Sequence, residues 1–322
     1  MQITQKSVTE LFGIPGAEQA MLPVGDGSNP HTPKKITNYV FRKDIVRDIR
    51  AFINDDNEFG MAFIGHAGCG KTTSVQQFYA ACGLPLYQTT ATGSATVDDL
   101  LGGLHATENG SFKYVKRSLL LAMEQGVPIL IDEYNNFSAE TALGLNTILE
   151  GNIVTVEATG ETITPAAGFK VYIALNDDTG LGIYNGRKKQ DISNNGRFQW
   201  QKVTYPTEEE ETRILEPILS ASVTDQTSRA AIIKGMVTVA RKIRAQFIGD
   251  EQAGGDSLEV VLTTRDLCRW ARLACTFAGA TSPVAYGFAR AFGNSPMPST
   301  NREAIYQICE AELGEFFKAD AV

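Results

Sequence analysis

Short apolar runs alternate with helical patterns through the middle of the chain. The apolar runs carry almost no charged residues, as expected for strands that are covered on both faces of a sheet. They span residues 61–65, 84–90, 127–132 and 169–176. Helices are predicted between them, beginning near Lys71, Lys113 and Ser138. This alternation predicts an α/β domain in which helices flank a parallel sheet.

The pattern becomes helical after Pro206. Thr207 stands three residues before Glu210, which is the spacing of a capping box at the start of a helix. Later segments with helical spacing of apolar residues are 230–247, 262–279 and 301–317. We therefore expect residues 206–322 to form an all-helical domain.

The rest of the chain divides into an arm and the α/β domain. Residues 1–38 are rich in Gly, Pro, Ser and Thr, which predicts an irregular N-terminal arm. The α/β domain is expected over residues 39–205, and a helical stripe of apolar residues opens it at Val40, Ile45, Ile49 and Phe52. Within this domain, residues 151–165 alternate around a Thr159-Gly160 turn, which predicts a β-hairpin.

Composition narrows the classes of partner. The 322 residues include 29 Lys and Arg against 37 Asp and Glu, a formal net charge of −8. An acidic chain is a poor candidate for sequence-independent binding of nucleic acid, which depends on neutralising phosphates. The basic cluster at 187–189 makes this exclusion partial.

Other features of the sequence indicate a cytoplasmic protein that is not bound to a membrane. No run approaches the roughly 18 apolar residues that a membrane span requires. The start of the sequence lacks the basic and apolar regions of a secretory signal. The five cysteines contain no CxxC pair and the three histidines are scattered, so reduced thiols are expected rather than disulfides or zinc.

Residues 65–72, GHAGCGKT, fit the phosphate-binding pattern GxxxxGK[ST] between a predicted strand and a predicted helix. The glycines allow successive backbone N–H groups to point at phosphates. Lys71 is expected to reach the β- and γ-phosphates, and the Thr72 hydroxyl to bind Mg²⁺. The predicted nucleotide-binding residues of this loop are Gly65, His66, Ala67, Gly68, Cys69, Gly70, Lys71, Thr72 and Thr73.

Polar residues end two of the later predicted strands. Asp132 and Glu133 follow the run 127–132, and Asn176 ends the run 169–176. Ligands bind at the carboxyl ends of strands in doubly wound sheets, so these side chains are expected to face the phosphates. Asp132 would hold Mg²⁺, Glu133 would orient the attacking water, and Asn176 would bind the γ-phosphate and that water.

Together these motifs resemble those of AAA+ ATPases, and within them the MoxR group and its CobS-type chelatase ATPases. The resemblance is carried by GHAGCGKT, DDLLGG, GVPILIDEYN, ALNDDTGLGIYNG and TTRDLCRWA. It implies a P-loop AAA+ core with a helical lid, hydrolysis of ATP with Mg²⁺, and a homo-oligomeric ring, expected to be a hexamer. It also implies that the hairpin at 151–165 is the helix-2 insert of the MoxR branch.

The resemblance further implies that an arginine acts on the γ-phosphate of the neighbouring subunit. The family pattern at this place is Asp-Arg-Phe, and Arg197 before Phe198 matches it, although Gly196 replaces the acid. Arginine suits this role because its planar, permanently charged group stabilises charge on phosphoryl oxygens. Arg187 is the alternative.

A second arginine is implied at the start of a lid helix. Arg265 is the candidate, with Thr264 as the helix N-cap. Arg269 and Arg272 lie one and two turns further along and are the alternatives.

The function implied by the resemblance is an ATP-driven ring motor. It would remodel a partner protein or drive a chelatase-like complex, together with a von Willebrand A-domain protein. Phe112 and Tyr114 are candidates for contact with a client. The alternatives are a nucleic-acid-directed AAA+ motor, a GTP-using AAA+ restriction-type motor, and a P-loop kinase of small molecules. Asn176 and the two arginines argue against the kinase.

Overall fold

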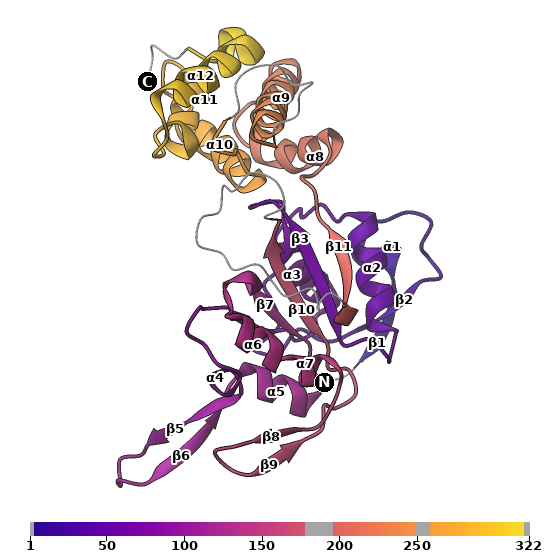
Figure 1. Ribbon diagram of the computed structural model, residues 1–322. Coiled ribbons are helices and arrows are strands. Elements are labelled where there is room, and N and C mark those ends of the chain that lie inside the picture. The colour runs from indigo at the N-terminus through magenta and orange to yellow at the C-terminus, as the bar shows by residue number, and fades with distance from the viewer. Residues whose placement is uncertain (1–2, 178–195, 249–257, 319–322) are drawn as a thin grey trace. The chain divides into compact units, whose positions relative to one another are not determined.

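The computed structural model describes residues 3–177, 196–248 and 258–318, which fall into two units. The first unit contains residues 3–66, 71–177 and 196–203, and the second contains 67–70, 204–248 and 258–318. Figure 1 shows the sheet of the first unit and the helices of the second. Among these residues, no helix has the length and apolar character needed to cross a bilayer.

The centre of the first unit is a five-stranded parallel sheet in the order β11-β3-β10-β7-β4. Its strands are β3 (Gly60–Gly65), β4 (Tyr87–Thr90), β7 (Ile129–Asp132), β10 (Val171–Asn176) and β11 (Phe198–Lys202). The first four confirm the predicted apolar strands, whereas β11 was not predicted. The central strand β10 is buried from Val171 to Leu175, which explains why its sequence is continuously apolar.

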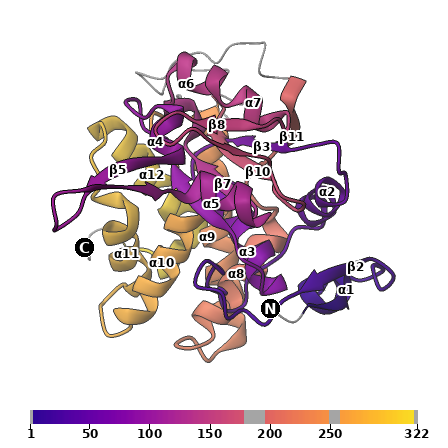
Figure 2. The same ribbon diagram turned by 90° about the horizontal axis from the view of Figure 1, so that it is seen from below.

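Helices flank this sheet, as the alternating pattern predicts (Figures 1 and 2). They are α2 (Lys43–Ile53), α3 (Lys71–Cys82), α4 (Val97–Leu101), α5 (Ser118–Gln125), α6 (Ala139–Gly144) and α7 (Asn146–Leu149), with a short 3-10 turn at Tyr134–Asn136. On α2 the residues of the predicted stripe that lie inside the helix, Ile45, Ile49 and Phe52, are buried. Apolar side chains at this spacing share one helix face, so burying them fixes the helix against its neighbours.

The helix predicted near Lys113 is wrong. Residues Phe112–Lys116 form strand β6, which pairs antiparallel with β5 (Gly102–Ala106), and the following helix begins only at Ser118. The hairpin turn contains Asn109 and Gly110, and Gly110 has a φ of 78°, in the left-handed region. An Asn-Gly pair between alternating residues is a hairpin signal. Figures 1 and 2 both show this hairpin extending away from the sheet.

The predicted hairpin at 151–165 is present. β8 (Val154–Val156) pairs antiparallel with β9 (Glu161–Ile163). It lies in the chain between α7 and β10, not within a helix. The β5–β6 hairpin lies between α4 and α5, and the assignment of the 151–165 hairpin as a helix-2 insert stays a prediction.

The N-terminal arm is not wholly irregular. β1 (Thr4–Ser7) pairs antiparallel with β2 (Met21–Val24), and α1 (Val8–Phe12) lies between them in the sequence. Phe12 is buried, with its ring stacked on that of Phe78 at 5.1 Å between centroids. This apolar contact anchors the arm to α3, a contribution that the polar composition of the arm conceals.

The second unit is helical, as expected from the spacing of its apolar residues. Its helices are α8 (Glu208–Leu219), α9 (Gln226–Ile248), α10 (Thr264–Thr276), α11 (Pro283–Phe288) and α12 (Ser299–Leu313), with a π-helical turn at Ala289–Gly293 and a 3-10 turn at Gly314–Phe316. Trp270 and Phe288 meet edge to face in its core. The Trp270 indole N–H donates to the Val284 carbonyl at 2.8 Å, so its polar group is satisfied.

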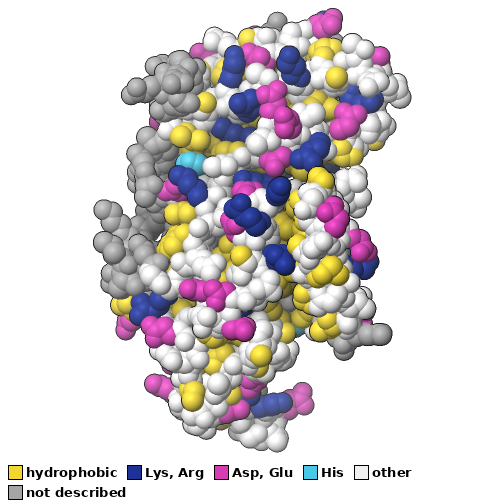
Figure 3. Space-filling view, turned by 90° about the vertical axis from the view of Figure 1, so that its right-hand side faces the viewer, with side chains coloured by type: hydrophobic (Ala, Val, Ile, Leu, Met, Phe, Trp, Pro, Cys, Tyr) yellow, Lys and Arg dark blue, Asp and Glu magenta, His cyan; other side chains and the backbone are white. Residues whose placement is uncertain are grey.

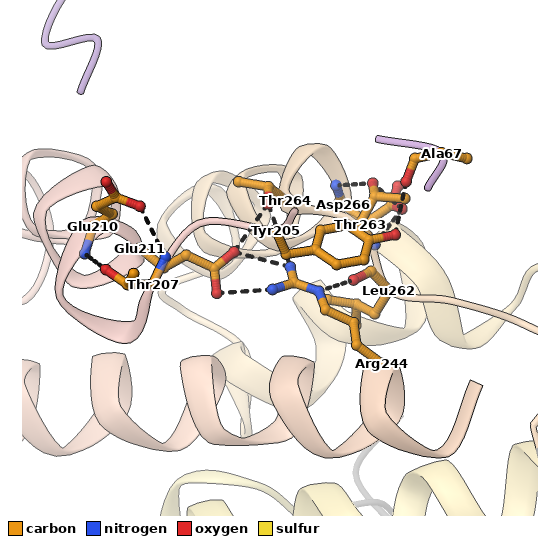
Figure 4. A network of polar contacts seen from close by, with 10 residues as sticks. All are labelled: Ala67, Tyr205, Thr207, Glu210, Glu211, Arg244, Leu262, Thr263, Thr264 and Asp266. Carbon is orange, nitrogen blue, oxygen red and sulfur yellow. Dashed lines mark hydrogen bonds and ion pairs between the residues drawn. The ribbon is translucent and has the colours of Figure 1, made fainter. Parts of the chain in front are cut away.

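The starts of two helices test the predicted caps (Figure 4). The capping box of Thr207 and Glu210 is confirmed on α8. On α10 the N-cap is Thr263 rather than the predicted Thr264. The Thr263 hydroxyl accepts the Asp266 N–H at 3.2 Å, and the Asp266 carboxylate accepts the Thr263 N–H, also at 3.2 Å. Thr263 is the N-cap because Asp266, three residues later, completes a capping box with it.

A buried ion pair joins α8 and α9. The Arg244 guanidinium donates to the two carboxylate oxygens of Glu211 at 3.0 and 2.9 Å, and the side chains are 4% and 0% exposed. The same two helices carry an exposed pair, Arg241 with Glu208, whose side chains are 58% and 47% exposed.

On the face drawn in Figure 3, acidic and basic side chains are interspersed rather than gathered by sign.

We expect Glu211→Gln to destabilise the second unit by about 3–5 kcal/mol, because it leaves the Arg244 charge buried without a counter-charge. Urea unfolding followed by circular dichroism measures this loss. The matched control is Glu208→Gln, which breaks the exposed pair and should cost at most about 1 kcal/mol. Equal losses in the two variants would contradict this account of the buried pair.

Candidate nucleotide-binding site

The loop between β3 and α3 has the backbone shape that its glycines predict. β3 ends at Gly65 and α3 begins at Lys71, so the GHAGCGKT sequence connects strand to helix. Gly68 and Gly70 have φ values of 70° and 98°, in the left-handed region that other residues rarely adopt. The loop can therefore curl tightly at both positions.

Lys71 is held in the first unit by three oxygen atoms. Its ammonium donates to the carbonyls of Gly65 and His66, each at 2.8 Å, and to the Asn176 Oδ1 at 2.9 Å. The Lys71 residue is only 8% exposed. The register of β3 and β10 pairs Gly65 with Asn176, which explains why residues 105 positions apart in the chain meet. The structure thus brings together two of the predicted site residues.

The two acidic residues stand at the end of the neighbouring strand. Asp132 is the last residue of β7, and Glu133 follows with a φ of 54° and a ψ of 38°. An Asp132 carboxylate oxygen accepts the Glu133 N–H at 2.9 Å, and the Asn136 amide donates to Glu133 at 2.8 Å. A left-handed backbone costs energy for a residue other than glycine, so these contacts hold Glu133 in a strained position.

The other residues of the loop differ in how far they are buried. Cys69 is buried, and it stands at a variable position of the pattern. Burial lowers the pKa of His66, although the negative charge of Asp177 opposes this effect. A neutral imidazole at pH 7 follows from the lowered pKa. Thr72 and Thr73 lie half-buried in the first turn of α3.

The candidate arginines lie in different surroundings. Arg197 binds Glu150 of the same chain through Nε at 2.8 Å and Nη2 at 2.7 Å. Arg265 is exposed in the first turn of α10 in the second unit. Arg269 pairs with Asp266 at 3.2 Å, and Arg272 is exposed. Arg187 lies outside the described residues.

One contact of the loop escaped the sequence analysis. The Tyr205 hydroxyl donates to the Ala67 carbonyl at 2.7 Å, and both residues belong to the second unit. In the sequence, Tyr205 marks only the end of the expected α/β domain. No local pattern identifies it, because its partner is 138 residues away.

Two protein families match most of the chain. Residues 60–186 match the AAA domain (dynein-related subfamily), and residues 221–311 match the CbbQ/NirQ/NorQ C-terminal domain. The chain is 26% identical to the aerobic cobaltochelatase subunit CobS of Sinorhizobium sp over 90% of this chain and 85% of the relative.

Further relatives have similar identities. Protein NorQ of Paracoccus denitrificans is 26% identical over 66% of this chain and 74% of that protein. The denitrification regulatory protein NirQ of Stutzerimonas stutzeri is 27% identical over 53% of this chain and 59% of that protein.

We expect Asn176→Asp to weaken ATP binding by roughly tenfold or more. The new carboxylate would lie about where Oδ1 now meets the Lys71 ammonium, and it would both compete with and repel the phosphates. Titration with a fluorescent ATP analogue measures the dissociation constant. Asn109→Asp, in the exposed turn of the β5–β6 hairpin, makes the same charge change and should leave it unaltered. Unchanged affinity in Asn176→Asp would remove that residue from the site.

Proposed function

Since the chain belongs to the MoxR-like group of AAA+ ATPases, whose activity is the hydrolysis of ATP, we propose that it uses this reaction to remodel a partner protein. The observation that supports the assignment of the site is the contact of the Lys71 ammonium with Asn176, with the acidic pair on the next strand. Phosphate-binding, acidic and polar groups thereby occupy successive strand ends of one sheet.

We propose that the nucleotide lies on the loop of residues 65–72 and that Mg²⁺ accompanies it. The Thr72 hydroxyl and the Asp132 carboxylate are oxygen donors, which Mg²⁺ prefers, so the donor set fits this ion. The bound ion would neutralise charge that develops on the phosphate oxygens.

The protein's own residues would position the reaction rather than form covalent bonds. Lys71 would exchange its present oxygen partners for β- and γ-phosphate oxygens. Glu133 would accept a hydrogen bond from the attacking water, in line with the bond to the leaving group. Asn176 would bind the γ-phosphate and the same water. Its amide can donate to one while its carbonyl oxygen accepts from the other.

AAA+ proteins generally form rings, and we propose a hexamer of this chain with a site at each subunit interface. Arg197 would leave Glu150 and reach the γ-phosphate of a neighbouring subunit. Arg265 would contribute a second positive charge from α10. We also place the boundary between the ATPase core and the helical lid near residue 205.

We propose that the client is a protein. We also propose that a partner subunit with a von Willebrand A domain works together with this chain. The β5–β6 hairpin offers a candidate contact, because Phe112 is 72% exposed and Leu104 is 57% exposed. The strand register places both side chains on one face of the hairpin, with Tyr114 opposite Leu104. The CobS relative is named a cobaltochelatase subunit, so a chelatase-like complex is the second setting that we propose for the motor.

Glu133→Gln tests the proposed chemistry. We expect ATP affinity within about twofold of the wild type and hydrolysis reduced by roughly 100-fold or more, because the amide cannot accept a proton from water. Phosphate release and nucleotide titration measure the two quantities. Glu140→Gln on the exposed part of α6 is the matched control. Brisk hydrolysis by Glu133→Gln would disprove the role.

Arg197→Ala tests action between subunits. The variant should bind ATP yet lose hydrolysis by roughly 1,000-fold, as for arginines that stabilise the transferring phosphoryl group. Mixing it with a Lys71→Ala variant should restore part of the activity, since each variant supplies the group that the other lacks. Arg47→Ala, which breaks an exposed contact with Asp48, is the control. The absence of rescue would count against an intersubunit role.

A further inference from the structure

The loop of residues 65–72, proposed to bind the nucleotide, is held by a hydrogen bond from a distant side chain. The Tyr205 hydroxyl donates to the Ala67 carbonyl at 2.7 Å, and Figure 4 shows the ring of Tyr205 between this carbonyl and Arg244. Ala67–Gly70 and the residues from 204 onward belong to one unit. The contact therefore lies within a single compact part of the structure.

Tyr205 is itself held in place by a buried charged group. The centre of the Arg244 guanidinium lies 4.3 Å from the centroid of the Tyr205 ring, which is a cation–π contact. Arg244 also donates to the Leu262 carbonyl at 2.8 Å and to both carboxylate oxygens of Glu211. The Thr264 hydroxyl donates to Glu211 at 3.0 Å. The guanidinium has little freedom to move, so it forms a firm platform for the ring.

A peptide unit is planar and trans, so its carbonyl oxygen and the following N–H point in opposite directions. Fixing the Ala67 carbonyl toward Tyr205 therefore fixes the direction of the Gly68 N–H. We propose that Tyr205 is a positioning residue for nucleotide binding, which holds the Gly68 N–H ready for a phosphate of a nucleoside di- or triphosphate. This inference rests on the proposed function of the loop.

A second contact restricts the same peptide. A Cβ atom added to Gly68 would lie 2.4 Å from the Thr263 Cβ, so the glycine packs directly against this side chain. Thr263 is held by its capping box with Asp266. The loop is thus supported at Ala67 by a hydrogen bond and at Gly68 by van der Waals contact.

Loss of the Tyr205 hydrogen bond should change the affinity of the loop for nucleotide rather than the rate of the chemical step. Loop N–H groups cradle the α- and β-phosphates, which ADP and ATP share. Losing the support should weaken both nucleotides alike and raise KM for ATP. The kcat at saturating ATP should stay within about twofold, because interactions common to bound substrate and transition state do not change it.

Tyr205→Phe tests the proposal, because it removes the hydroxyl and keeps the ring in contact with the Arg244 guanidinium. Calorimetric titration of the full chain with ADP should show a Kd raised roughly 3- to 10-fold, as for the loss of one hydrogen bond, with unchanged stoichiometry. Tyr286→Phe is the matched control. The Tyr286 ring also contacts an arginine of the second unit, because the centre of the Arg290 guanidinium lies 3.1 Å from its centroid. The Tyr286→Phe variant should leave the Kd for ADP unaltered.

The outcomes separate this inference from the function on which it rests. A wild-type chain that fails to bind ADP would contradict the proposed nucleotide site. A wild type that binds, with the same Kd in Tyr205→Phe, would overturn the positioning role alone. The role would equally be overturned if Tyr286→Phe raised the Kd as much, or if Tyr205→Phe lowered kcat or stoichiometry at constant Kd.

Discussion

The parallel pairing of β3, β10 and β7 is the constraint on which the candidate site depends. Parallel strands in register end at the same edge of a sheet, so Gly65, Asn176 and Asp132 finish neighbouring strands although they are widely separated in the chain. The three strands are nearly continuously buried, and a slip of one residue would exchange the faces of every side chain. The apolar core thereby fixes the geometry of polar groups that it does not contain.

The second unit depends on a different kind of interaction. Its helices are joined by apolar packing, but Arg244 and Glu211 place a complete ion pair inside that packing. Such a pair contributes little net stability, since both charges lose their water on folding. The pair instead fixes the orientation of the Arg244 guanidinium. Its plane can contact Glu211, Leu262 and the Tyr205 ring together in only one orientation.

The sequence predicted the features that are encoded locally. Uninterrupted apolar runs identified β3, β4, β7 and β10, and the Thr207 capping box identified the start of α8. β11 escaped because Gln and Lys interrupt its apolar residues, and it is completed by pairing with the distant β3. The helix expected near Lys113 is instead strand β6, although the Asn109-Gly110 turn before it is visible in the sequence. The contacts of Tyr205 and of Arg197 with Glu150 join residues 138 and 47 positions apart, and no local pattern reveals such contacts.

The three oxygen partners of Lys71 have a thermodynamic consequence. An ammonium ion loses much of its hydration when it is buried, and here that loss accompanies folding, because Gly65, His66 and Asn176 replace the water. A phosphate bound as proposed would therefore meet a cation that is already dehydrated, and its association would be an exchange of oxygen ligands around the Lys71 nitrogen. The free-energy gain is then the difference between a charged and a neutral acceptor. Such an exchange would favour anionic ligands over neutral ones of the same shape, so the proposed nucleotide would be selected first by the charge of its phosphates.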